Sequence, residues 1–364
     1  MLASNIILAS SKWDASADLT QCLTQAGFLL QEGSGFYSYQ SLGLLGLRQI
    51  EDRARKQLDA LGLAEWSMAS LQQNSVWEKT GRAADYGQEL MSVQLRSGQI
   101  MRLSATAEEQ VTQAVLNQLQ GRYHDFHVYQ ITQKWRDELR ARGGLLRGRE
   151  FRMLDAYHFA QNEALMHAQN QKVLEALVEL LESFGCVVRV ENADCGEIGG
   201  LASQEIQVKT DLVEEGWLEV GHCFALGQTY SQAFGLKHSE KDYSWMSCQG
   251  LGTSRLLAVL LHARRSGQRI WGDEQFSIFD DVLVCIAQSQ EIREQARRWY
   301  HHRLSQGRRV LWEDRFERAG QALTASEAVG AQTRWLFTDR LDGAHVEKET
   351  LGDQRKEIQK IEGG

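Results

Sequence analysis

The pattern of apolar residues changes near Ser277, and this change limits the folds that the chain can adopt. Ahead of it, Phe126 to Thr132 and Phe151 to Phe159 alternate like strands and flank a basic loop with glycines, which predicts an antiparallel hairpin. Beyond it, short strands alternate with helical segments, which is typical of βαβ units with parallel strands. The sequence therefore predicts a larger N-terminal region followed by a separate small α/β domain.

Hydrophobic periodicity outlines the other elements. Leu44 to Leu61 has apolar residues at helical spacing and ends at Gly62, and Thr106 opens a second helix. The longest helical pattern runs from Glu163 to Phe184. Further strands are predicted at Val187–Val190, Trp217–Phe224, Tyr243–Cys248, Val282–Ala287, Arg309–Trp312 and Arg334–Phe337, with helices at Leu251–Arg264 and up to Leu304.

With 364 residues, 24% charged and 43% hydrophobic, the chain is expected to be a soluble globular protein with two or three cores. This excludes disordered and fibrous classes. No apolar run approaches the roughly 20 residues of a membrane span, and the N-terminal residues lack the features of a secretory signal. We therefore expect a cytoplasmic protein with no membrane partner. The six cysteines are widely spaced, without a C-x-x-C pair, and are expected to be reduced thiols.

The chain contains no proline, although average usage predicts about 18 in this length. Glycine is abundant, at 32 residues, so turns are built from other residues. Proline is useful in loops and in the first turn of helices in every fold class. Its exclusion therefore points to how the protein is made rather than to how it folds.

The net charge of −8 argues weakly against a nonspecific nucleic-acid coat but leaves room for a local basic surface. Two runs are rich in basic residues, from Lys134 to Arg152 and from Arg293 to Arg309. Taken alone, each run is most simply a solvated surface.

Two glycine-containing turns carry arginines that could bind phosphate. Arg136 follows one predicted strand and Arg147 precedes the next, while Arg255 ends the stretch Gly250-Leu251-Gly252-Thr253-Ser254-Arg255. Neither turn matches a P-loop or a G-x-G-x-x-G motif. Because arginines on two neighbouring strand ends can bind separate phosphates of one nucleotide, the combination predicts a nucleotide site.

Ordered motifs over nearly the whole chain resemble those of the bacterial-type prolyl-tRNA synthetases, a group of class II aminoacyl-tRNA synthetases. The resemblance is carried by Gly35-Phe36-Tyr37-Ser38-Tyr39, Tyr86-Gly87-Gln88-Glu89-Leu90, Thr106-Ala107-Glu108-Glu109, Arg136-Asp137-Glu138, Arg147-Gly148-Arg149-Glu150-Phe151, Glu219-Val220-Gly221-His222, Gly250 to Arg255 and Glu313-Asp314-Arg315. It implies an α+β catalytic domain over residues 1–277, with an antiparallel sheet flanked by helices. Residues 278–364 would form an anticodon-binding-like α/β domain. It also implies a homodimer whose two-fold interface includes Leu44 to Leu71.

The activity implied by this resemblance is the ATP-dependent conversion of proline to prolyl-adenylate, followed by transfer to tRNA. Neither step needs a covalent enzyme intermediate, so positioning and fixed positive charge must supply the rate. By resemblance, Arg136, Glu138 and Arg255 are catalytic. The ATP site would comprise Arg136, Glu138, Arg147, Glu219, Gly250, Gly252 and Arg255, and Glu219 could hold Mg²⁺.

Proline recognition needs a small apolar slot and an acceptor for the secondary ammonium group. The resemblance assigns this slot to Thr106, Glu108, Arg136, Phe151, Met153, His222 and Phe224. Plainer interpretations exist for several of these residues. Thr106 and Glu109 match a T-x-x-E capping box, His222 fits a buried histidine with satisfied hydrogen bonds, and Phe151 and Met153 fit core positions.

The chain also departs from the family pattern. Residues other than proline stand where the family carries it, at Ala69, Ala105, Ala141, Gly272 and Ala319. The insertion that removes mischarged alanine in many bacterial members is absent between Leu212 and Glu219, so editing is not expected. Gln321-Ala322-Leu323-Thr324 replaces a segment that normally carries lysines facing the anticodon, which would weaken tRNA binding.

Three functions therefore stay open. The first is a proline-tRNA ligase whose own synthesis needs no prolyl-tRNA, which would serve under starvation or in the presence of an inhibitor or toxic analogue. The second is a biosynthetic ligase that activates proline or an analogue for another acceptor. The third is a noncatalytic regulator, which is disfavoured because Arg136, Glu138 and Arg255 are all present.

Overall fold

The computed structural model describes residues 1–6, 8, 18–119, 124–316, 318–341 and 344–361. The chain divides into two compact units, one of residues 33–36 and 49–257 and the other of residues 1–32, 37–48 and 258–364. Among the described residues, no helix is long and apolar enough to cross a membrane. The domain boundary predicted after residue 277 stays a prediction.

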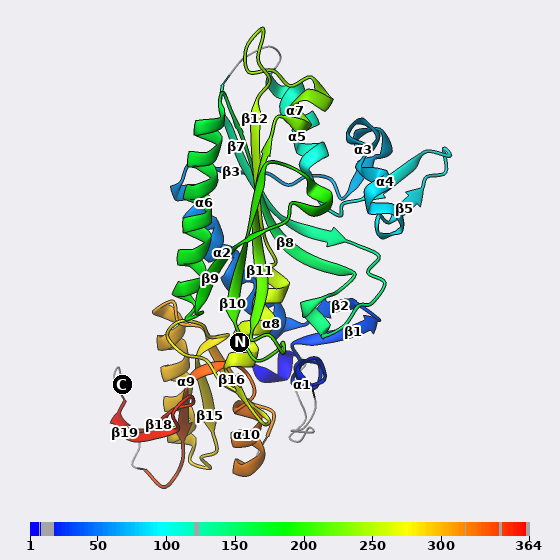
Figure 1. Ribbon diagram of the computed structural model, residues 1–364. Helices are drawn as coiled ribbons and strands as arrows, with labels where there is room; N and C mark the ends of the chain where they lie inside the picture. Colours follow the sequence, from blue (N-terminus) through cyan, green and yellow to red (C-terminus); the bar gives the residue numbers. More distant parts are fainter. Residues whose placement is uncertain (7, 9–17, 120–123, 317, 342–343, 362–364) are drawn as a thin grey trace. The chain divides into compact units, whose positions relative to one another are not determined.

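A seven-stranded sheet organises the first unit, in the order β3-β7-β8-β12-β11-β10-β9 (Figure 1). Its strands are β3 (Ala64–Glu65), β7 (Phe126–Trp135), β8 (Glu150–Ala160), β9 (Val188–Ala193), β10 (Ala202–Lys209), β11 (Trp217–Gly227) and β12 (Trp245–Leu251). Neighbouring strands are antiparallel except for β3, which pairs in parallel with β7 at the edge. The expected antiparallel sheet is confirmed, with one short parallel strand added.

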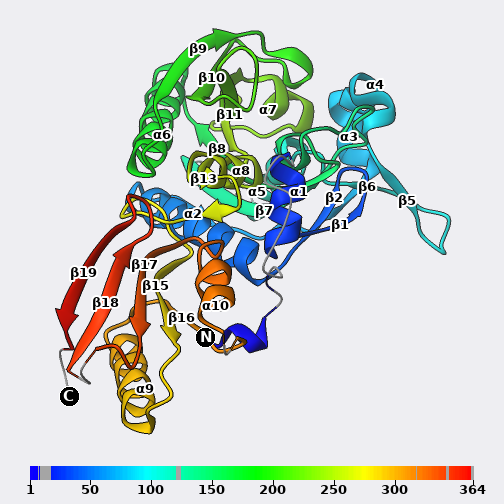
Figure 2. The same ribbon diagram turned by 90° about the horizontal axis from the view of Figure 1, so that it is seen from below.

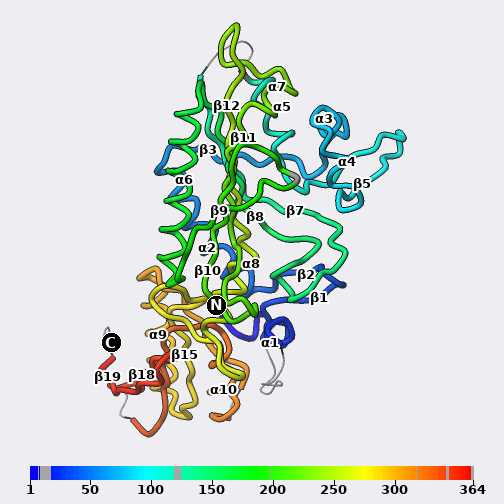
Figure 3. Tube along the Cα trace, in the orientation of Figure 1, coloured from blue at the N-terminus to red at the C-terminus, as the bar shows by residue number. Residues whose placement is uncertain are grey.

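The predicted hairpin lies within this sheet as β7 and β8. Phe126 pairs with Phe159 and Trp135 pairs with Glu150, so both strands are longer than their alternation alone indicates. The loop of residues 136–149 that joins them can be followed in Figure 3. Because side chains alternate between the two faces of a strand, Phe151, Met153, Asp155 and Tyr157 all point to one face of β8.

Helices cover both faces of the sheet. α6 (Glu163–Ser183) packs against β8, β11 and β12, and the Asn162 side chain caps its first turn by accepting from the Leu165 N–H. On the opposite face, α5 (Glu108–Leu119) and α7 (Thr229–Phe234) share an apolar core with β8 and β12. α2 (Ser41–Ala60) and α8 (Thr253–Ala263) are the other long helices that the sequence predicts near these strands.

A smaller three-stranded sheet, in the order β4-β6-β5, also belongs to the first unit. It consists of β4 (Leu71–Gln73), β5 (Ser92–Gln94) and β6 (Ile100–Leu103), accompanied by the short helices α3 (Asn74–Thr80) and α4 (Arg82–Tyr86). The sequence does not predict these strands, because they are short and have no clear alternation. The remaining short elements are α1 (Leu19–Ala26), β1 (Leu29–Gly33), β2 (Phe36–Tyr39), β13 (Arg265–Ser266) and β14 (Arg269–Ile270).

The second unit contains a five-stranded sheet in the order β16-β15-β17-β18-β19 (Figure 2). Its elements are β15 (Phe279–Cys285), α9 (Gln290–Ser305), β16 (Val310–Glu313), α10 (Ala319–Ser326), β17 (Ala331–Phe337), β18 (His345–Thr350) and β19 (Arg355–Lys360). β15 pairs in parallel with β16 and β17, as the βαβ pattern indicates. The antiparallel hairpin of β18 and β19 was not predicted, because its residues are almost all polar or charged.

Candidate active site

A pocket of about 180 Å³ lies over β8, β11 and β12 in the first unit. Every residue that the sequence assigned to the proline slot or the ATP site lines it: Thr106, Glu108, Arg136, Glu138, Arg147, Phe151, Met153, Glu219, His222, Phe224, Gly250, Gly252 and Arg255. These residues come from five separate stretches of the chain, and the fold brings them to one place. Their individual roles remain predictions.

Thr106 and Glu108 lie at the start of α5, at the buried end of the pocket. The Thr106 hydroxyl donates to Glu108 Oε2, and the Cys248 thiol donates to Oε1 at 3.5 Å. The Tyr157 hydroxyl accepts from the backbone N–H of Ala107, between them. Glu108 is only 2% exposed, so a carboxylate is held in a dry, hydrogen-bonded position at the end of the pocket.

The sequence reasoning missed Arg82 and gave Glu109 a capping role only. Arg82 Nη1 lies 3.3 Å from Glu108 Oε2 and 2.9 Å from Glu109 Oε1. Glu109 also accepts from the Thr80 hydroxyl at 2.9 Å. The capping-box interpretation is therefore wrong, because Thr106 donates to Glu108 and the Glu109 carboxylate turns to Arg82. No sequence spacing signals this, since Arg82 belongs to another helix.

Electrostatics sets the charge of the pocket carboxylate. Burial disfavours the ionised form, but the Arg82 guanidinium and the Thr106 hydroxyl outweigh it and hold the pKa of Glu108 below its usual range. Burial raises the pKa of Glu109, and the neighbouring Glu108 charge adds to this effect, while Arg82 opposes it. Glu108 is thus a carboxylate that can accept from a cationic group.

Arg136 keeps most of its guanidinium available. Its Nε donates to the backbone oxygen of Ala105 at 3.2 Å, and its Cζ lies 5.4 Å from the Phe151 ring centre. Among the described residues Arg136 forms no ion pair within 4.0 Å. A backbone carbonyl orients the side chain without neutralising it, which is what a ligand-binding arginine requires.

The other two predicted phosphate-binding arginines have different partners. Arg147 donates from Nε to Glu138 Oε2 at 2.7 Å, so these two predicted nucleotide contacts are paired with each other. Arg255 donates to the backbone oxygens of Leu146 at 2.9 Å and Glu219 at 2.7 Å. Arg255 is therefore held in place mainly by carbonyl groups, whereas Arg147 must leave Glu138 to bind a phosphate.

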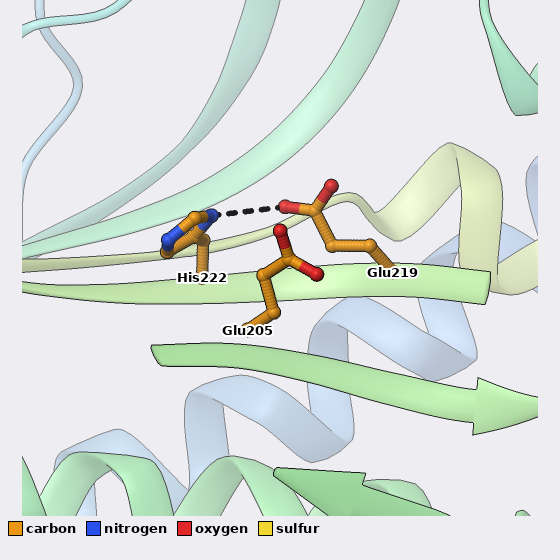
Figure 4. A group of neighbouring side chains, drawn as sticks. All are labelled: Glu205, Glu219 and His222. Carbon is orange, nitrogen blue, oxygen red and sulfur yellow. Dashed lines mark hydrogen bonds and ion pairs between the residues drawn. The ribbon is translucent and has the colours of Figure 1, made fainter. Parts of the chain in front are cut away.

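A β-bulge assembles Glu205, Glu219 and His222 (Figure 4). Regular alternation would put residues 219 and 222 on opposite faces of β11. The register instead shifts beside Ile206 and Gln207, so that Val220 has no partner on β10 and both side chains share one face. His222 Nδ1 lies 3.1 Å from Glu219 Oε1, and the His222 ring stacks on Phe224 with centres 4.0 Å apart. His222 is half-buried, and Nε2 has no hydrogen-bond partner in the described part of the chain.

This cluster suits a hard divalent cation. Ligand atoms of the three side chains lie within 4.8 Å of one another. Burial opposes ionisation of Glu219, but the hydrogen bond from His222 and the charge of Arg255 lower its pKa. Two carboxylates beside the predicted phosphate-binding arginines match the oxygen ligands that Mg²⁺ prefers. Glu205 had no sequence signal, because only the bulge aligns it with Glu219.

The walls of the pocket are apolar, with Phe151, Met153 and Phe224 around its deeper part. Gly250 contributes no side chain, and a Cβ at this position would lie 3.6 Å from Met153 Sδ. Cys248, two residues before Gly250, donates from its thiol to the Glu108 carboxylate. The result is a small slot with one charged end, suited to a compact amino acid.

The basic run from Lys134 to Arg152 is not simply a solvated surface. Lys134 is fully buried and its Nζ lies 2.8 Å from Asp155 Oδ1. Arg152 donates to both carboxylate oxygens of Glu51, at 2.6 and 2.9 Å. The run thus supplies buried ion pairs beneath the pocket as well as the arginines that line it.

Comparison with known proteins shows which proteins this chain is similar to. The family model of the class II core domain of tRNA synthetases (G, H, P, S and T) matches residues 93–264. The chain is 29% identical to the proline–tRNA ligase of Anaplasma marginale over 80% of this chain and 79% of that protein. It is 39% identical to the proline–tRNA ligase of Listeria innocua over 56% of this chain and 36% of that protein.

Solved structures share the fold. Prolyl-tRNA synthetase from Giardia lamblia, in complex with prolyl-adenylate, superposes with a TM-score of 0.84 at 15% identity, covering 98% of this chain and 77% of that one. Prolyl-tRNA synthetase from Cryptosporidium parvum, with halofuginone and AMPPNP, gives a TM-score of 0.83 at 15% identity, covering 95% and 74%.

Proposed function

We propose that this chain is a class II aminoacyl-tRNA synthetase and, within that class, a proline–tRNA ligase. The observation that carries the proposal is one pocket in which a buried carboxylate, an apolar slot and three arginines meet. The relatives that match the chain over most of its length are themselves proline–tRNA ligases.

The amino-acid end would work as follows. Glu108 and Thr106 accept the two N–H groups of the secondary ammonium, and Phe151, Met153, His222 and Phe224 enclose the ring. Arg136 holds the substrate carboxylate, whose oxygen attacks the α-phosphorus of ATP. Because Arg136 is oriented by a carbonyl and not neutralised, its charge is free to stabilise the charge that develops on the phosphate.

The nucleotide end would use the remaining residues. Arg255 and Arg147 bind the outer phosphates, and Glu138 binds the adenine amino group once Arg147 has left it. Pyrophosphate leaves. A hydroxyl of the terminal ribose of tRNA then attacks the prolyl carbonyl carbon, so that an ester bond forms, the acyl–phosphate bond breaks and AMP leaves with the bonding electrons. Glu219 and Glu205 would hold Mg²⁺, which would neutralise phosphate charge.

The direct test is ATP–pyrophosphate exchange with proline, alanine, cysteine and proline analogues of other ring sizes, followed by charging of proline tRNA. We expect exchange with proline and transfer to tRNA. Soluble, folded protein that catalyses neither reaction with any of these substrates would overturn the proposal.

A second candidate is a ligase that delivers activated proline or an analogue to another acceptor. It is favoured by α10, whose sequence from Ala319 to Ser326 contains no cation where the family is expected to face the anticodon. Exchange without charging of ordinary proline tRNA would select this candidate over the first.

The absence of proline supports synthesis of this protein while proline charging is blocked. If folding were the reason, proline would be harmful at every position. Ala319 is the first residue of α10, and Arg318 before it has φ −88° and ψ 124°, which suits a following proline. We expect Ala319→Pro to keep or raise thermal stability, by about 0.5 kcal/mol. By contrast, Gly272→Pro should disrupt the fold, since the Gly272 N–H donates to Ala331 and a Cβ there would lie 2.3 Å from Ser277.

We propose that the enzyme works as a homodimer in the cytoplasm. Four apolar side chains of the three-stranded sheet and its turns, namely Leu71, Val93, Leu95 and Ile100, are 36–48% exposed. An apolar surface of this kind is typical of an interface. Light scattering of the protein and of Ile100→Lys tests this, and a monomeric wild type would contradict it.

A further inference from the structure

We propose that Arg82 is a positioning residue for substrate recognition, acting through Glu108 so that the pocket presents a charged carboxylate to the ammonium group of the amino acid. This inference rests on the function proposed above, because it concerns how the same pocket selects a cationic amine. Arg82 does not line the pocket itself.

The geometry places Arg82 between two carboxylates. A single nitrogen, Nη1, contacts both Glu108 Oε2 at 3.3 Å and Glu109 Oε1 at 2.9 Å. The side chains of Arg82, Glu108 and Glu109 are 6%, 3% and 0% exposed. Three aromatic rings, those of Trp77, Tyr86 and Tyr230, lie 5.3–5.6 Å from the guanidinium carbon. Water is therefore unable to replace Arg82 as the partner of these carboxylates.

The two carboxylate oxygens of Glu108 have different partners, so one is bound by the protein and the other can bind the substrate. Oε2 is taken by the Thr106 hydroxyl and by Arg82. Oε1 accepts from the Cys248 thiol at 3.5 Å, and a thiol is a weak donor. Oε1 is thus the oxygen that can exchange its partner for a substrate ammonium.

The surrounding groups make Arg82 decisive for the charge of Glu108. The titratable groups packed around this carboxylate are Arg82 and Tyr86 on α4, Glu109 on α5, Tyr157 on β8, Tyr230 on α7 and Cys248 on β12. Arg82 is the one cation in this set, and Arg136 forms no ion pair with Glu108 among the described residues. Without Arg82, burial would leave Glu108 protonated at neutral pH. A protonated Glu108 has no negative charge and has an O–H donor in place of one acceptor, so recognition of the ammonium would be weakened.

The experiment uses the full chain with Arg82→Met and Glu108→Gln, and follows ATP–pyrophosphate exchange from pH 6 to 9. We expect Arg82→Met to raise KM for proline about 10- to 100-fold at pH 7, as for loss of a charge-assisted hydrogen bond, with KM for ATP nearly unchanged. The KM of Arg82→Met for proline should fall as the pH rises, because Glu108 then ionises. Glu108→Gln should show the same rise without recovery, and the double variant should be no worse than Glu108→Gln.

Two further variants separate positioning from folding. Arg82→Lys keeps the charge and should restore most of the affinity for proline. Arg334→Met is a matched control in the five-stranded sheet, where Arg334 is 4% exposed and paired with Glu349. It should lose thermal stability as Arg82→Met does, while KM for proline stays unchanged. Should Arg82→Met prove insoluble, Arg82→Gln with Glu109→Gln removes one charge of each sign and should show the same pH dependence.

A readout that needs no turnover distinguishes failure of this inference from failure of the proposed function. Infrared difference spectra of wild type and Glu108→Gln report whether Glu108 is a carboxylate at pH 7. We expect a carboxylate band in the wild type and a protonated carbonyl band after Arg82→Met. A pH-independent KM in Arg82→Met, or an ionised Glu108 without Arg82, would overturn the positioning role. Absence of exchange in wild type with an ionised Glu108 would overturn only the proline–tRNA ligase function.

Discussion

The arginines of the pocket and those of the five-stranded sheet differ in what they bind. In the pocket, Arg136 and Arg255 are oriented chiefly by backbone carbonyl groups. Beside the five-stranded sheet, Arg303 on α9 donates to Asp281 on β15 at 2.8 and 3.0 Å, and Arg309, which precedes β16, pairs with Asp280 at 2.5 Å. A carbonyl positions a guanidinium without cancelling its charge, whereas a carboxylate does both.

This contrast also distinguishes the two basic runs of the sequence by what their arginines bind. The run from Arg293 to Arg309 is not simply a solvated surface, because Arg303, Arg308 and Arg309 contact Asp280 and Asp281. Asp281 is fully buried and also accepts from the Trp335 indole at 2.7 Å. In that unit, ion pairs of arginines with aspartates hold strands and helices together. In the pocket, the guanidinium groups of Arg136 and Arg255 are available to bind a ligand.

The largest expected effect is on catalysis. Arg136→Ala should lower ATP–pyrophosphate exchange by about 10²- to 10³-fold, as for removal of one preorganised donor to a developing anion. Thermal denaturation should change little, because the described side-chain hydrogen bond of Arg136 is to a single backbone oxygen. A large loss of stability with retained exchange would place Arg136 among the structural arginines instead.

The reverse result is expected in the five-stranded sheet. Asp281→Ala leaves Arg303 and the Trp335 indole without their acceptor, and should lower the free energy of unfolding by about 3 kcal/mol. Chemical denaturation measures this, and exchange at a temperature where the variant is folded should equal that of wild type. Lost exchange with unchanged stability would remove the distinction between the two regions.

Arg147 tests the intermediate case, an arginine of the pocket that is paired with a carboxylate. Arg147→Ala should raise KM for ATP about 10-fold, the effect of one charge-assisted hydrogen bond, with KM for proline unchanged. Because its side chain is 48% exposed, the loss of its ion pair with Glu138 should cost less than about 0.5 kcal/mol of stability. An unchanged KM for ATP would show that Arg147 serves only Glu138.

The smallest effect concerns pH. Burial of Asp280 favours its neutral form, but the hydrogen bonds from Arg309 outweigh this and lower its pKa. A lowered folded pKa stabilises the protein above the unfolded value near 3.9, and this contribution disappears as the pH falls through the folded value. Asp280→Asn should therefore cost about 0.5–1 kcal/mol at pH 7 and less at pH 2. Urea unfolding at both pH values measures it, and an equal cost at both would exclude an ionic origin.

Much of the fold follows from local patterns. The helix predicted from Glu163 to Phe184 is α6 (Glu163–Ser183), and the hairpin predicted around the basic loop is β7 and β8. Elements with weak alternation were missed, such as β18 and β19: β18 takes its register from pairing with β17, and β19 takes its register from pairing with β18, rather than from an apolar face. Local periodicity reports burial, so a strand with two polar faces gives no signal.

The sequence was sufficient to name much of the pocket, because the residues assigned to proline and ATP all line it. The partners of those residues were decided only by the tertiary structure. Arg82 meets Glu108 across two helices, and Glu205 meets Glu219 because a bulge shifts one strand. A motif specifies which side chains are present. Their charge and direction depend on what packs against them, and packing is a property of the folded chain.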